Sequence, residues 1–166
     1  MFTDVQSFIT EYKNEAIATQ RLLDALADDS LRQKATKDGR PLGQIAWHLA
    51  QACEILAPAG LTVPHPEKDS PHPAYASTIA QAYKTAADAI LETAQARLTD
   101  ALLAETIEQF GRKMTKGYLL YLFLKHEIHH RGQLTVLMRI AGLPIAGVYG
   151  PSKEEWERFG MEAPAY

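Results

Sequence analysis

The 166-residue chain has the length of one domain, and a chain of this size can bury a core without disulfides. Its 46% hydrophobic and 22% charged residues are typical of a globular protein rather than a disordered one. The net charge of -3 argues against a nucleic-acid-binding module, and the single cysteine, Cys53, excludes an internal disulfide framework and a cysteine-rich zinc site.

The sequence also lacks the features of a membrane or secreted protein. No apolar run is long enough to span a membrane, and the N-terminal residues lack the basic and apolar segments of a secretory signal. We therefore expect one domain, residues 1–166, in the cytoplasm, with no nucleic-acid or membrane partner.

Hydrophobic residues recur at helical spacing in four long segments. The predicted helices cover residues 2–28, 41–57, 74–98 and 116–141. Thr115 is the expected N-cap of the last of these, and Gly142 follows its end.

The predicted connections differ in character. Residues 28–40 are polar, and residues 58–73 contain five prolines, which exclude a continuous helix. Residues 99–114 contain a helical turn at 100–104 and then a less regular stretch with no convincing strand pattern.

A short C-terminal helix is predicted after the last long one. Ser152 and Glu155 match a capping box at its start. We expect Trp156 and Phe159 to attach this helix to the rest of the domain.

Four long helices without a strand pattern predict an all-α fold, a four-helix bundle with a short C-terminal helix. The proline-rich connection is long enough to run the length of a bundle, so the second and third helices can be parallel. The topology up-down-down-up is therefore permitted, although the sequence pattern does not require it.

Two histidines interrupt the apolar face of the last long helix. His126 and His130 are four residues apart and so project from one face, while His129 lies toward a flank. Together with them, the expected core-facing seam contains Leu119, Phe123, Leu137 and Ile140.

A third histidine, His48, lies on the apolar face of the second helix. Imidazoles in a core are costly without a partner, and a divalent cation is one such partner. Metal sites in helical bundles are built from inward side chains on facing helices. A metal site is therefore one reading of this pattern, and a hydrogen-bonded core histidine is the usual reading of His48 alone.

Residues 126–130 also match H-E-x-x-H, the zinc-peptidase helix motif. The extended form of that motif fails, because Gln133 and Val136 stand where glycine and histidine are needed. No strand is evident to hold a peptide, so a peptidase is the weaker alternative.

The string His-Glu-Ile-His-His-Arg-Gly-Gln-Leu at residues 126–134 resembles the signature of the DinB/YfiT-like family. Ile-Ala-Trp-His-Leu at residues 45–49 and the segment from Gly142 to Ser152 are similar to the corresponding parts of that family. The resemblance extends over nearly the whole chain.

This resemblance implies an up-down-down-up four-helix bundle, commonly a homodimer, with three histidine ligands at His48, His126 and His130. Relatives in the family include transferases that use low-molecular-weight thiols such as bacillithiol, the metal-binding domain of a mycothiol-dependent isomerase, and proteins described as metal-dependent hydrolases. The expected cofactor is a divalent metal ion, zinc or nickel.

We therefore expect a metal-dependent hydrolase or thiol S-transferase that acts on a small molecule, with a low-molecular-weight thiol as the candidate partner of a transferase. The alternative is a non-catalytic, metal-binding stress-response protein. Glu127 could polarise a metal-bound water, orient a ligand or simply be solvated, and Arg131 could pair with Glu127 or with a carboxylate on another helix.

Overall fold

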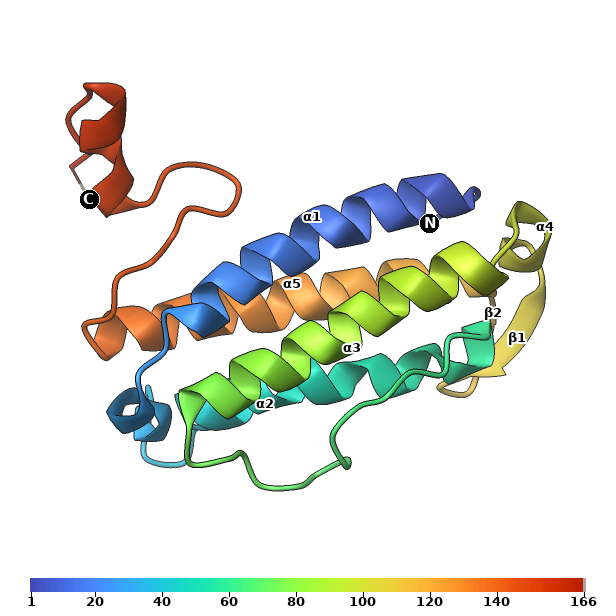
Figure 1. The fold of residues 1–166 in the computed structure, drawn as a ribbon, viewed down its shortest axis with the longest axis horizontal. Helices are drawn as coiled ribbons and strands as arrows, with labels where there is room; N and C mark the ends of the chain where they lie inside the picture. Colours follow the sequence, from blue (N-terminus) through green and yellow to red (C-terminus); the bar gives the residue numbers. More distant parts are fainter. Residues whose placement is uncertain (166) are drawn as a thin grey trace.

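Four long helices pack side by side in a computed structural model, which describes residues 1–165 (Figure 1). These helices are α1 (Val5–Asp24), α2 (Leu42–Gln51), α3 (Ala76–Arg97) and α5 (Lys116–Ile140). Within residues 1–165, no helix has an apolar stretch of the length that crossing a membrane requires. The all-α prediction is confirmed for the long elements of the fold.

The order of the helices follows from their contacts. Both α1 and α2 pack against α3 and against α5. Figure 1 shows α2 and α3 running in one direction and α1 and α5 in the opposite direction. The connection from Gly60 to Tyr75 returns the chain to the end of the bundle at which α2 begins, and this return makes α2 and α3 parallel.

Hydrogen bonds from backbone N–H groups to side-chain caps determine where α1 and α5 begin. Asp4 Oδ1 accepts a hydrogen bond of 2.8 Å from the Ser7 backbone N–H, so α1 begins at Val5 rather than at residue 2. Thr115 Oγ1 accepts one of 3.2 Å from the Tyr118 N–H, which confirms the predicted cap of α5.

Two of the predicted helices are shorter as α-helices than the periodicity suggested. The predicted end of the first helix lies beyond α1, and a short 3-10 helix, η1, follows at Asp28–Arg32. The second helix changes at Ala52 into a 3-10 helix, η2 (Ala52–Ala59), which ends at Gly60 with φ 93°. Apolar spacing alone does not distinguish these tighter turns from α-helix.

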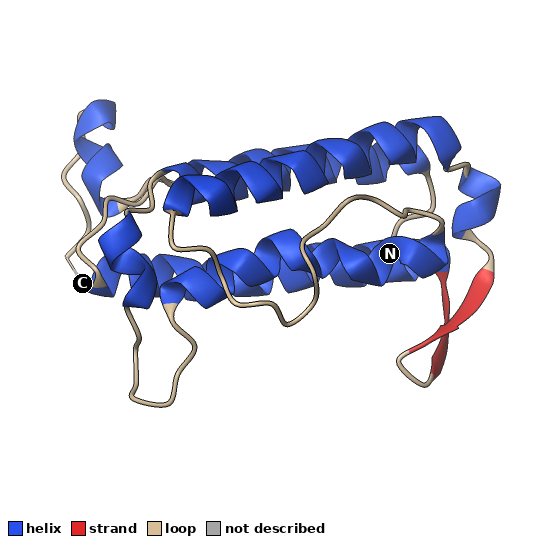
Figure 2. Cartoon of the chain, turned by 60° about the horizontal axis from the view of Figure 1, so that its bottom comes forward, coloured by secondary structure: helices blue, strands red, loops and turns tan. Residues whose placement is uncertain are grey.

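The stretch after α4 (Asp100–Leu103) corrects the sequence prediction, because it forms a β-hairpin. Strands β1 (Thr106–Gln109) and β2 (Arg112–Thr115) pair antiparallel, and Figure 2 shows them at one end of the bundle. Both turn residues have positive φ, 53° at Phe110 and 68° at Gly111, as in the two-residue turns that match the twist of a hairpin. Four-residue strands are too short for alternation to be recognised in the sequence.

The C-terminal segment also differs from the sequence prediction. It forms a 3-10 helix, η3 (Lys153–Phe159), beyond the end of α5 (Figure 1). Trp156 is partly buried, but Phe159 is 62% exposed rather than attached to the bundle. The segment is held instead by polar contacts, an ion pair between Glu154 and Arg139 and a hydrogen bond from the Gly147 N–H to Glu155 Oε2.

Gly117 allows the N-terminal residues to approach the start of α5. A Cβ atom at this position would lie 2.0 Å from the carbonyl oxygen of Phe2, whose N–H donates to the Gly117 carbonyl. We expect Gly117→Ala to lower the free energy of unfolding by about 1–3 kcal/mol, since the backbone of Phe2 must move away. Chemical denaturation measures this change.

Gly132→Ala is the matched control for Gly117→Ala. Gly132 lies on the same helix with no atom within 4 Å of an added Cβ, and alanine there should stabilise the helix by about 1 kcal/mol. If Gly117→Ala and Gly132→Ala changed the free energy of unfolding equally, the steric explanation would be contradicted.

Candidate metal centre

Three histidine side chains meet between α2 and α5. His48 comes from α2, and His126 and His130 come from successive turns of α5. His126 Nε2 lies 3.3 Å from His48 Nε2 and 3.1 Å from His130 Nε2. One nitrogen from each of the three rings therefore points to a common position, and the three residues could hold a metal ion.

The spacing of these nitrogens fits a single cation. Tetrahedral zinc bound to imidazole at its usual bond length places two ligand nitrogens about 3.3–3.4 Å apart. The separations of 3.3 and 3.1 Å between these nitrogens are close to that value. Three neutral imidazoles cannot all pair their facing nitrogens with one another, and a shared cation would satisfy all three lone pairs.

Gln133 orients one of the rings. Its Oε1 lies 2.8 Å from His130 Nδ1, so the amide oxygen accepts the Nδ1 proton and leaves His130 Nε2 free for the cation. His126 Nδ1 is buried without a hydrogen-bond partner among the described residues. The sequence motif predicts no role for Gln133, although its position three residues after His130 is the signal for this contact.

The electrostatic surroundings keep the three rings neutral near pH 7. Burial lowers the pKa of His126 to about 4, and the neighbouring His130 and His48 act in the same direction. Burial is also the main cause of the lowered pKa values of His48 and His130. Neutral imidazole is the form that binds metal, so the site is prepared for a cation at neutral pH.

The acid sensitivity of the metal-free protein follows from these shifts. A histidine whose pKa is depressed by folding favours the folded state above its unfolded pKa, about 6.5, and this contribution is lost as the pH falls. We expect the melting temperature of the metal-free protein to drop between about pH 6.5 and pH 4, the pKa of His126. Thermal melts across this range measure the effect, and His126→Gln should flatten the profile.

The histidines lie beside the core rather than at its centre. His130 is 9% exposed and His126 and His48 are half-buried, whereas Ile140 of the expected seam is 50% exposed. The other apolar residues of that seam, Leu119, Phe123 and Leu137, are buried as expected, and the buried surface of α5 extends beyond them to Leu120, Leu134 and Met138. One side of the trio is consequently open toward solvent.

A cavity of about 280 Å³ lies on that open side. His48 and His126 line it together with residues from η2, from the proline-rich connection and from the tip of the hairpin. Phe110, 63% exposed at the hairpin tip, is one of its walls. A small molecule in this cavity would therefore contact two of the three histidines.

The other histidines and the cysteine are not part of the trio. His129 is exposed on the flank of α5, as the helical period predicts, and His65 is exposed with Nδ1 hydrogen-bonded to the Pro66 carbonyl. His72 packs against Gly43. Cys53 is buried, and burial raises the pKa of its thiol to about 12, so it is a packed rather than a reactive cysteine.

Glu127 is neither solvated nor directed at the three histidines. It is 2% exposed and accepts hydrogen bonds from Thr19 Oγ1 at 2.8 Å and from Tyr83 Oη at 2.5 Å. Burial raises the pKa of its carboxyl group, an effect that these hydrogen bonds oppose. The direct catalytic role considered for Glu127 is therefore unsupported, because its carboxylate faces α1 and α3.

Arg131 pairs with a carboxylate on another helix, one of the two options considered for it. Its guanidinium forms a buried ion pair with Glu15 of α1 and donates to Thr19 Oγ1 at 3.2 Å. Tyr149, from the loop after α5, joins this pair by accepting from Arg131 at 2.6 Å and donating to Glu15 at 2.7 Å. The sequence pattern does not predict that Glu15 and Tyr149 belong to this network.

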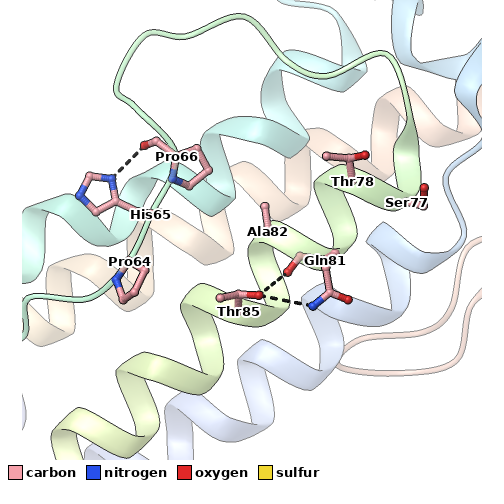
Figure 3. A pocket seen from close by; sticks show the side chains of 8 residues that line it. All are labelled: Pro64, His65, Pro66, Ser77, Thr78, Gln81, Ala82 and Thr85. Atoms are coloured by element: carbon pink, nitrogen blue, oxygen red, sulfur yellow. Dashed lines mark hydrogen bonds between the residues drawn. The ribbon is translucent and has the colours of Figure 1, made fainter.

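A second cavity, of about 530 Å³, lies between the proline-rich connection and α3 (Figure 3). Some of its polar side chains form hydrogen bonds with one another or with the backbone: Thr85 Oγ1 donates to the Gln81 carbonyl, and His65 bonds to Pro66. Among residues 1–165, no group of metal-ligating side chains such as the trio lines this cavity. We therefore assign the candidate site to the three histidines.

Comparison with known proteins relates the whole chain to one family. The model of the DinB family matches residues 1–164. The uncharacterized protein YrdA of Bacillus subtilis is 44% identical over 165 residues, which is 99% of each chain. A DinB-like protein of Bacillus cereus with a crystal structure is 39% identical, covers 90% of this chain and 100% of its own, and superimposes with a TM-score of 0.86.

A more distant solved relative has the same fold. The DinB-like protein YjoA of Bacillus subtilis is 25% identical, covers 87% of this chain and 99% of its own, and has a TM-score of 0.64. The names of these relatives give no substrate or reaction.

Proposed function

This chain belongs to the DinB family, and we propose that it is a metal-dependent enzyme that binds one divalent ion, zinc or nickel, through His48, His126 and His130. The observation that carries the proposal is the convergence of three Nε2 atoms from two helices at metal-ligand spacing. The reaction that we propose is hydrolysis or thiol transfer to a small electrophile.

Three protein ligands with an open side are typical of catalytic metal sites, whereas structural sites are usually closed by four. When bound, the cation would act as a Lewis acid that lowers the pKa of a water or thiol ligand. The protein would supply the orientation: Gln133 holds the ring of His130, and the packing of α2 on α5 holds His48 opposite. The cavity next to His48 and His126 would admit the small molecule.

Metal content and turnover test the proposal together. The protein is purified without an affinity tag, so that no metal is introduced by the column, and its metal is identified and counted by elemental analysis. Ester hydrolysis and thiol-dependent consumption of electrophiles are then measured, with His126→Ala as the inactive control. Stoichiometric metal and turnover that is lost in the variant would support the enzyme.

The second candidate is a non-catalytic metal-binding protein, and one observation favours it. The three histidines join α2 to α5, so a cation bound by them would cross-link two helices and stabilise the bundle. A large increase in melting temperature on metal addition, without turnover of any substrate class, would support this alternative.

The family resemblance is also the basis for proposing a homodimer. Val136 and Ile140 near the end of α5 are 56% and 50% exposed, and burial of such side chains between two copies would be favourable. Sedimentation equilibrium of the wild-type protein and of Val136→Asp tests this proposal, which a monomeric wild-type protein would refute.

A further inference from the structure

The cavity beside the three histidines has charges of both signs on its walls. Lys68 and Asp69 come from the proline-rich connection, and Glu54 comes from η2. Among residues 1–165, none of these three side chains forms an ion pair or a side-chain hydrogen bond. Oppositely charged groups thus surround one small cavity without neutralising one another by contact.

The backbone that carries Lys68 and Asp69 is held in place by the helix that carries His48. Gln51 Nε2 donates to the Glu67 carbonyl at 2.5 Å and to Ser70 Oγ at 3.1 Å, and Trp47 Nε1 donates to the same Ser70 Oγ at 3.1 Å. Both helix residues are buried, with 5% of Gln51 and 9% of Trp47 exposed.

The turn itself is also closed by its own contacts. The Ser70 N–H and Oγ both donate to the Glu67 carbonyl, at 3.3 and 2.6 Å. Asp69 has a left-handed backbone conformation with φ 58°, which is uncommon for a residue other than glycine and presents its side chain at the cavity. The turn is therefore a built wall of the cavity rather than a loose loop.

Asp69 lines the same cavity as His48 and His126, two of the candidate metal ligands. Ala52, Ile55 and Phe110 supply apolar surface to this cavity. The cavity thus offers a negative group, a positive group and an apolar wall around the open side of the trio.

We propose that this cavity binds a small zwitterionic molecule of amino-acid size, whose ammonium group is held by Asp69 and Glu54 and whose carboxylate is held by Lys68. The inference rests on the proposed function, because another part of the same molecule would reach the metal at His48, His126 and His130. The volume of about 280 Å³ is at the lower limit for small-molecule sites and fits a ligand of this size. Unpaired charges of both signs discriminate against ligands that carry only one charge or none.

A matched set of four hydroxamates tests the inference, since each has the same metal-binding group. Aspartate β-hydroxamate carries the ammonium and the carboxylate, β-alanine hydroxamate carries only the ammonium, succinic monohydroxamate carries only the carboxylate, and propionohydroxamate carries neither. Dissociation constants for the zinc-loaded full-length protein are measured by calorimetry. We expect the zwitterion to bind about tenfold more tightly than the uncharged probe, with about threefold from each charge.

Two variants identify the groups responsible. Asp69→Asn preserves the left-handed backbone, because asparagine tolerates it. It should reduce the increase in affinity that the ammonium provides, with Glu54 still present, and leave the contribution of the carboxylate unchanged. Lys68→Ala should remove only the increase in affinity that the carboxylate of the probe provides. The exposed residues Asp29 and Lys13 lie outside this cavity, so Asp29→Asn and Lys13→Ala are matched controls that should change neither gain.

Gln51→Ala tests the positioning of the turn. It should weaken binding of the zwitterion several-fold and leave propionohydroxamate unaffected, because the uncharged probe does not use the turn.

The possible results distinguish a failure of the proposed function from a failure of the zwitterion inference. A protein that binds neither zinc nor nickel would overturn the proposed function and this inference together. If zinc is retained and propionohydroxamate binds, equal affinity for all four probes, or an unchanged preference in Asp69→Asn and Lys68→Ala, would overturn the zwitterion inference alone.

Discussion

Replacing Arg131 with alanine is expected to lower the free energy of unfolding by about 3–5 kcal/mol, because it leaves the buried carboxylate of Glu15 without its cation. Arg131 and Glu15 are 2% and 5% exposed, so water cannot replace the lost partner. The substitution also removes a donor to Thr19 and to Tyr149. Urea denaturation measures the change as a lower midpoint at an unchanged slope.

Two comparisons show whether the lost charge pairing is the cause. The double variant Glu15→Gln with Arg131→Met removes both charges and should recover much of the stability, since neither partner is then left as a buried ion. Lys84→Ala breaks the exposed pair with Asp88, in which both side chains are more than half exposed, and should leave the midpoint almost unchanged. A small effect of Arg131→Ala, equal to that of Lys84→Ala, would contradict the importance of the buried network.

His126→Ala is expected to abolish stoichiometric metal binding. His126 Nε2 is the nitrogen that lies within 3.3 Å of both other ligand nitrogens, so its removal leaves two imidazoles without their common neighbour. Loss of an outer hydrogen-bond partner costs about 10- to 100-fold in metal affinity, and loss of a ligand should cost at least as much. Elemental analysis of the dialysed protein gives the stoichiometry.

His129→Ala is the matched control on the same helix. His129 is exposed and lies outside the group of nitrogens that could hold the ion. The two variants should have the same helical content, so a difference in metal content reports on ligation rather than on folding. Equal retention of metal in both proteins would refute the three-histidine site.

The positions of the charged core residues could not be predicted from hydrophobic pattern. Apolar spacing places the seam of α5 through Phe123 and Ile140, but the buried face includes Glu127 and Arg131 instead of Ile140. Each of these polar side chains is buried because a partner on another helix satisfies it, Tyr83 for Glu127 and Glu15 for Arg131. Such partners are 44 and 116 residues away, and no local pattern contains them.

The small elements were missed for a different physical reason. The hairpin of β1 and β2 has strands of four residues, and its turn depends on the positive φ values of Phe110 and Gly111. Phe110 makes this turn hard to recognise in the sequence, because the residues that readily adopt positive φ are glycine, asparagine and aspartate. The turn at residues 67–70 depends on contacts of Ser70 and Glu67 with the distant residues Trp47 and Gln51, in addition to its own hydrogen bonds between Ser70 and Glu67.

The sequence by itself determined the four long helices, the cap at Thr115, and the separation of His126 and His130 from His129 on α5. These features depend on interactions within a few residues, which the period of a helix makes visible. Only the tertiary structure decided that His48 Nε2 lies 3.3 Å from His126 Nε2, that Glu127 faces away, and that the turn at residues 67–70 forms a wall of the cavity. These features depend on how α2, α3 and α5 pack, and the free energy of that packing comes from contacts between distant parts of the chain.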